Sequence, residues 1–160
     1  MKVLVLYYSK GGNTHKLAEA IAEGVGQVDG VEAVLHHTRD VTKGDFVAAD
    51  GLIVGSPVYF GTMAAQVKQV LDEFVSVRKK MENKVGAAFS TAGDSSGGKE
   101  TTIMSIIQAL LIYGMIIVGD PMSATGHYGT ACVGAPDAAA RENGHKLGRR
   151  VAELVKQLGR

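Results

Sequence analysis

Short apolar segments alternate along the chain with segments whose apolar residues have the spacing of a helix. This alternation constrains the fold more than any other feature of the sequence. Strands are predicted at residues 2–8, 31–37, 51–56, 84–90 and 115–119. Apolar residues three and four positions apart predict helices over residues 17–25, 67–75, 103–111 and 147–158. Thr42 and Asp45 have the spacing of a capping box, which predicts a short helical turn before the third strand. Strands that alternate with helices form a parallel sheet covered on both faces, so we expect an α/β fold.

The size and composition of the chain limit its organisation and its partners. A chain of 160 residues, 46% of them hydrophobic, fits one globular domain, to which we assign residues 1–160. The formal net charge of +1 argues against a nucleic-acid partner. Cys132 is the only cysteine, which excludes an intrachain disulfide and a multi-cysteine metal site. No segment reaches transmembrane length, so we expect a cytoplasmic protein with no membrane insertion and no bound metal.

Three loops follow predicted strands at the edge where parallel strands end. The first, residues 9–14, reads Ser-Lys-Gly-Gly-Asn-Thr and opens directly into a helical pattern. Its glycines let the backbone approach an anion closely, and the N–H groups of the helix start favour negative charge. An ordinary capped turn is the alternative. We predict a phosphate site in this loop.

The second and third loops predict a partner that is planar and polar. The second, residues 56–62, places Pro57 and Gly61 around an apolar tip whose aromatic side chains either offer a flat surface to a flat ligand or fold back onto the sheet edge. The third, residues 91–98, combines small side chains and N–H donors with the carboxylate of Asp94. If the strand order is 2-1-3-4-5, all three loops meet at one crevice.

Two competing interpretations of the motifs are disfavoured by neighbouring residues. Residues 93–99 match the Gly-x-x-x-x-Gly-Lys pattern of a nucleotide triphosphatase loop, but Glu100 stands where a hydroxyl must bind Mg²⁺. A phosphatase-type thiolate at Cys132 would need a nearby arginine to lower its pKa and to bind an oxyanion, and the next several positions contain none.

With these motifs in place, the chain resembles the flavodoxin family of FMN proteins over nearly its whole length. Residues 55–63, 66–68, 71–72 and 97–103 are most similar to the tryptophan-repressor-binding-protein (WrbA) type of NAD(P)H:quinone oxidoreductase. The resemblance implies a flavodoxin-like three-layer sandwich, in which a five-stranded parallel sheet of order 2-1-3-4-5 carries helices on both faces. It also implies FMN as the cofactor and NAD(P)H as the electron donor.

The same resemblance implies the residues of the site. The residues implied for the FMN phosphate are Ser9, Lys10, Gly11, Gly12, Asn13 and Thr14. Those implied for the ring are Pro57, Val58, Tyr59, Phe60 and Gly61, followed by Ser90, Thr91, Ala92, Gly93 and Asp94. His127, within Gly-His-Tyr-Gly, falls where the WrbA type has a loop near the flavin, and it is a candidate proton donor. A solvated loop histidine is the alternative for His127.

The implied activity is a two-electron NAD(P)H:quinone oxidoreductase, in which NAD(P)H gives hydride to flavin N5, leaves, and is replaced by a quinone or another small acceptor. The alternative is an electron-transfer flavodoxin that serves protein partners, although those carriers are strongly acidic and this chain is nearly neutral. A third possibility is an interaction module that has lost its cofactor. Apolar loop tips predict a homodimer or homotetramer, although the chain lacks much of the insertion that the reductases carry after the second strand.

Overall fold

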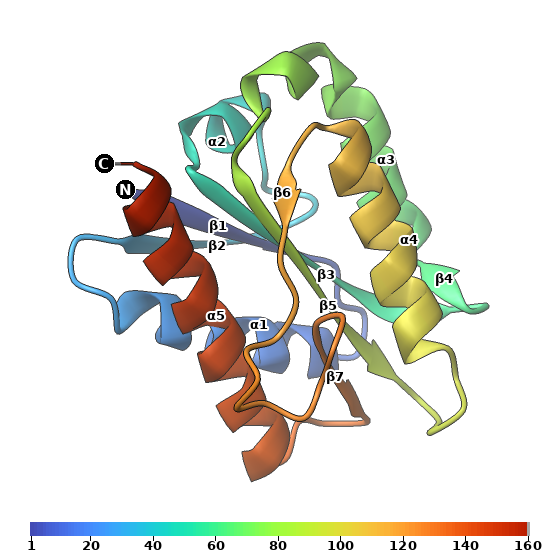
Figure 1. The fold of residues 1–160 in the computed structure, drawn as a ribbon. Helices are drawn as coiled ribbons and strands as arrows, with labels where there is room; N and C mark the ends of the chain where they lie inside the picture. The colour runs from blue at the N-terminus through green and yellow to red at the C-terminus, as the bar shows by residue number, and fades with distance from the viewer. Residues whose placement is uncertain (160) are drawn as a thin grey trace.

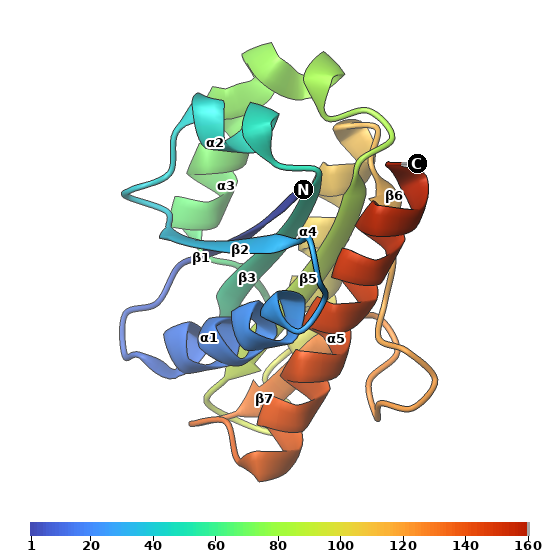
Figure 2. The same cartoon turned by 90° about the vertical axis from the view of Figure 1, so that its left-hand side faces the viewer.

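The computed structural model of the protein, which describes residues 1–159, places a sheet between two layers of helices (Figures 1 and 2). The strands are β1 Lys2–Tyr7, β2 Glu32–His37, β3 Gly51–Tyr59, β4 Thr62–Met63, β5 Val85–Ala92, β6 Ile116–Ile117 and β7 Thr130–Val133. Their order is β2-β1-β3-β5-β6, with β7 also paired to β5 and β4 paired to β3. All pairs except the β3–β4 hairpin are parallel, which confirms the predicted order.

Helices cover both faces of the sheet, as the sequence predicts. They are α1 Asn13–Gly26, α2 Lys43–Ala48, α3 Ala65–Glu73, the 3-10 helix η1 Phe74–Lys80, α4 Lys99–Ile112 and α5 Ala138–Leu158. Helices α1 and α5 pack on one face, and the others pack on the opposite face (Figure 1). The predicted capping box is present, because Thr42 and Asp45 each accept a hydrogen bond from the other's backbone N–H. None of the helices within residues 1–159 has the length and apolar character needed to cross a bilayer.

Helices α1 and α5 approach each other at glycines. A Cβ atom on Gly24 would lie 2.1 Å from the carbonyl oxygen of His145, and a Cβ atom on Gly148 would lie 2.0 Å from that of Ile21. Real Cβ atoms do not come this close to backbone oxygen, so only glycine permits the crossing. The contact fixes the position of α1 and therefore of the loop that precedes it.

The fifth strand differs from the prediction. The strand expected at residues 115–119 is reduced to β6, and after residues 118–129 the chain returns to the sheet as β7, which pairs with the carboxyl half of β5. With β7 and the short strand β4, which pairs with β3, the sheet has seven strands rather than five. The guanidinium of Arg150 donates to the carbonyls of Gly119, at 3.1 Å, and of Asp120, which gives these backbone groups a partner outside the sheet.

The second predicted loop is mostly strand. Strand β3 continues to Tyr59, and only Phe60 and Gly61 form the turn into β4, with Val58 paired to Met63. Phe60 and Gly61 have positive φ angles of 50° and 78°, as the turn of a two-residue hairpin requires. Pro57 is paired with β5 but lies two residues beyond Gly55, the last residue of β3 that pairs with β1, so β3 has an unpaired edge there, where a sheet tolerates proline.

Candidate active site

A cleft of about 310 Å³ opens at the carboxyl edge of the sheet, where the three predicted loops meet. The residues that line it are Ser9, Lys10, Gly11, Asn13, Thr14, Pro57, Val58, Tyr59, Thr91, Ala92 and Gly93. All of them belong to the site predicted from the sequence. The parallel order β1-β3-β5 produces this arrangement, because it sets the ends of three neighbouring strands side by side.

The first loop forms an open cradle at the start of α1. Gly12 caps the helix with a φ of 89°, and no side chain caps this end in the described structure, so the N–H groups of the first turn are available to an anion. The hydroxyl of Ser9 accepts a hydrogen bond from the Gly12 N–H at 3.0 Å, which closes the loop. A Cβ atom on Gly11 or Gly12 would meet no atom within 4 Å, so space above the cradle is open. These features fit a phosphate group.

A buried hydrogen bond joins the first loop to the third. The hydroxyls of Thr14, on α1, and Thr91, on β5, lie 2.8 Å apart, and both residues are buried. The ring of Tyr59, which also lines the cleft, makes an edge contact with Tyr8 at a centroid distance of 6.3 Å. The cleft therefore combines the polar groups of the cradle with the aromatic ring of Tyr59.

The other predicted site residues do not line the cleft. Ser90 is fully buried and donates to the carbonyl of Lys99 at 3.1 Å, so it supports the start of α4. Asp94 accepts the Ser96 N–H at 3.0 Å, which shapes the third loop. Phe60 is fully exposed at the hairpin tip, while Gly12 and Gly61 lie in the adjoining backbone turns.

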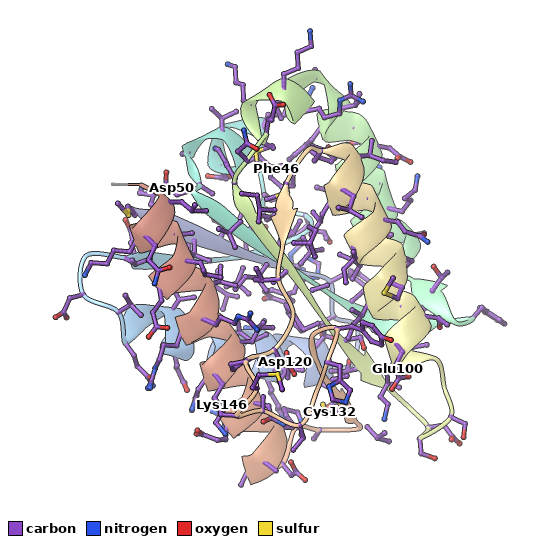
Figure 3. The ribbon with its side chains drawn as sticks, viewed as in Figure 1. Phe46, Asp50, Glu100, Asp120, Cys132 and Lys146 are labelled. Carbon is purple, nitrogen blue, oxygen red and sulfur yellow. The ribbon has the colours of Figure 1, made fainter. Side chains whose placement is uncertain are left out.

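His127 lines a second cavity and is not among the residues that line the first cleft. This cavity, of about 220 Å³, lies between the start of α4, the 118–129 segment and Asn143 of α5. Figure 3 shows Asp120 beside α5, and Glu100 at the first turn of α4. Asp120 is 6% exposed, and its Oδ1 accepts a hydrogen bond from the Thr130 hydroxyl at 3.2 Å, while its Oδ2 has no partner in the described structure.

Burial raises the pKa of Asp120, although the Thr130 hydroxyl, the Arg150 guanidinium and His127 oppose the shift. The folded protein therefore holds this proton more tightly than the unfolded chain, and the free energy of unfolding falls as pH rises from about 4 through the raised pKa.

We expect Asp120→Asn to reduce this fall in the free energy of unfolding and to be at least as stable as the wild type at pH 7. Urea unfolding from pH 4 to 7 measures the effect, with Glu100→Gln as the exposed control in the same cavity. Parallel pH profiles for wild type and Asp120→Asn would contradict it.

The structure also bears on two other kinds of site, a cysteine nucleophile and a metal centre. Burial raises the pKa of the Cys132 thiol to about 11, so the sulfur is neutral at pH 7 and is no thiolate nucleophile. Within residues 1–159, no three His, Cys, Asp or Glu side chains form a group that could hold a metal ion.

Comparison with known proteins agrees with the fold and shows the family of the chain. Residues 43–130 match the family described as NADPH-dependent FMN reductase. A relative named "Flavodoxin" from Aquifex aeolicus is 38% identical, with 96% of this chain and 86% of the relative covered. One named "NAD(P)H dehydrogenase (quinone)" from Syntrophobacter fumaroxidans is 33% identical, with both chains fully covered.

Solved structures are also similar to the fold of this chain. A flavodoxin, WrbA-like protein from Agrobacterium tumefaciens superimposes with a TM-score of 0.84 at 26% identity and covers 98% of each chain. A flavodoxin from the domain Archaea gives 0.82 at 27% identity, covering 98% of this chain and 99% of the other. These matches confirm the resemblance predicted from the motifs. The chain belongs to the NADPH-dependent FMN reductase family, and its fold is the flavodoxin-like fold of the WrbA type.

Proposed function

We propose that this protein is an FMN-dependent oxidoreductase that passes two electrons from NAD(P)H to a quinone or another small acceptor. The observation that carries the proposal is a single cleft that joins an anion cradle to an aromatic wall. The family match and the relative named NAD(P)H dehydrogenase (quinone) support the same conclusion.

The cleft offers a distinct role to each loop. The N–H groups at the start of α1, with the side chains of Ser9, Asn13 and Thr14, would hold the FMN phosphate, and the Lys10 ammonium would add positive charge. Residues 57–59 and 91–93 would hold the ring, and N–H groups of the third loop would stabilise negative charge on it. When bound, FMN supplies the redox chemistry, in which hydride taken at ring N5 from NAD(P)H, together with a proton from water, reduces a quinone to a hydroquinone.

The side chains that line the cleft do not include a histidine or a carboxylate. Because His127 lines the other cavity, protons for the acceptor would come from water. We therefore expect His127→Ala to keep at least about half of the wild-type turnover, since general acid catalysis contributes on the order of 100-fold or more where it operates. Steady-state oxidation of NAD(P)H with a benzoquinone measures it. A loss of turnover with FMN still bound would place His127 in the mechanism.

The decisive experiment begins with the cofactor content of the protein. The purified protein is saturated with FMN, supplied with NADH or NADPH and a benzoquinone, and compared with an equal concentration of free FMN. We expect nucleotide oxidation well above that of free FMN. Protein that takes up no FMN would be an interaction module instead.

An electron carrier is the second candidate, and the relative named "Flavodoxin" favours it. FMN-loaded protein that oxidises neither nucleotide faster than free FMN would support the carrier. Self-association into a homodimer or homotetramer stays a prediction, motivated by the fully exposed Phe60 at the hairpin tip. Light scattering of the FMN-loaded protein tests it.

A further inference from the structure

Two buried hydroxyl groups connect the cradle to the end of β5. Thr14, the second residue of α1, is 2% exposed, and Thr91, the residue before the last of β5, is 4% exposed. Their hydroxyl oxygens lie 2.8 Å apart, and both residues line the first cleft. The pair therefore joins the helix that begins at the cradle to the strand that leads into the third loop.

The pair has one hydrogen more than its own bond uses. Each threonine hydroxyl carries a single hydrogen, and the bond between the two oxygens takes one of them. Within residues 1–159, neither hydroxyl has another hydrogen-bond partner. The second hydrogen is therefore a buried donor without an acceptor, which is unfavourable until a ligand in the cleft accepts it.

The location of Thr14 indicates which of the two hydrogens a phosphate takes. Thr14 lies in the first turn of α1, where backbone N–H groups without a side-chain cap favour an anion. A phosphate dianion accepts hydrogen bonds and donates none, so the Thr14 hydroxyl must donate to it. The 2.8 Å bond is then donated by Thr91 and accepted by Thr14.

We infer that Thr91 is a positioning residue that turns the Thr14 hydroxyl toward the phosphate and makes it a stronger donor. The inference rests on the proposed function, in which the cradle holds the FMN phosphate. The bond from Thr91 selects one of the staggered positions of the Thr14 side chain. A hydroxyl that accepts one hydrogen bond is also polarised toward donating another, most of all to a charged acceptor. Thr91, which the resemblance implies for the ring, therefore acts on the phosphate.

The experiment is a double-mutant cycle on the two hydroxyls. Thr14→Val, Thr91→Val and the variant that carries both substitutions are compared with the wild type, because valine keeps the shape of threonine without the hydroxyl. Thr91→Ser returns the hydroxyl. Thr102→Val is the matched control, since the Thr102 hydroxyl is buried, has no partner in the described structure and does not line the cleft. The readouts are the affinity of the FMN-free protein for inorganic phosphate, by calorimetric titration, and its affinity for FMN, by fluorescence titration.

We expect Thr91→Val to weaken the binding of both ligands about fivefold, the factor that corresponds to one net hydrogen bond. Thr14→Val should weaken both by at least as much. Adding Thr91→Val to Thr14→Val should change the affinity no further, because Thr91 acts only through Thr14. Thr91→Ser and Thr102→Val should match the wild type.

Equal effects of Thr91→Val with and without the Thr14 hydroxyl would overturn the inference, because Thr91 would then contact the ligand itself. The inference is also overturned if Thr91→Val binds phosphate as tightly as the wild type, or if Thr91→Ser fails to restore the affinity. In these outcomes the wild type still binds FMN, and the proposed function stands. Wild-type protein that binds neither inorganic phosphate nor FMN would overturn the proposed function and the inference together.

Discussion

Asn13→Asp should weaken FMN binding about 1,000-fold, because it sets a carboxylate against the phosphate, and two unit charges 4 Å apart near a protein surface interact by about 4 kcal/mol. Asn13 is the first residue of α1 and lines the cradle. The same carboxylate lies at the positive end of the helix, so the protein without FMN should become more stable by about 0.5 kcal/mol. Affinity and stability should therefore change in opposite directions. Fluorescence titration with FMN and urea unfolding without it measure the two effects.

Asn83→Asp is the matched control for this prediction. Asn83 lies in the turn before β5, at the opposite end of the sheet, and its φ of 65° is one that aspartate also tolerates. The substitution adds the same charge far from the cradle, and FMN affinity should change little. Equal losses in both variants would mean that affinity follows net charge. Unchanged affinity in Asn13→Asp would place the phosphate elsewhere.

Gly148→Ala should lower the free energy of unfolding by about 3 kcal/mol, the upper end of the range for overpacking, because the new Cβ atom meets backbone atoms. The new Cβ atom would lie 2.0 Å from the carbonyl oxygen of Ile21 and 2.9 Å from the amide nitrogen of Val25, both on the backbone of α1. Alanine favours a helix over glycine by about 1 kcal/mol, so a loss of stability would oppose the intrinsic propensity. Because α1 must shift to make room, FMN affinity should also fall. Urea unfolding and FMN titration measure the two losses.

Gly26→Ala, near the end of α1, supplies the comparison. A Cβ atom there would meet no atom within 4 Å, so the variant should gain about 0.5 kcal/mol through helix propensity alone. Opposite signs at the two glycines would establish that contact, not propensity, requires glycine at the crossing. If both variants gained stability, α1 and α5 would not touch at Gly148.

The local pattern of the chain already predicted much of the candidate site. The cradle could be recognised because its glycines and hydroxyls are contiguous and stand directly between a strand and a helix. The strand order brought residues 57–59 and 91–93 to the same cleft, as predicted. The residues that were predicted but lie outside it, such as Ser90 and Asp94, bond to backbone groups or neighbouring residues whose geometry the sequence does not reveal.

The sequence by itself determined the layers and predicted a phosphate cradle at residues 9–14, since apolar periodicity and loop chemistry act between residues close in the chain. The sheet order was implied by the resemblance to the flavodoxin family. Only the tertiary structure decided where β3 ends, that β7 joins the sheet, and that His127 lines a different cavity. The last two depend on residues far apart in sequence, since Phe89 of β5 and Thr130 of β7 pair across 41 positions of the chain. Such contacts form only after the core has fixed the distances between the helices and the sheet, and no local pattern records them.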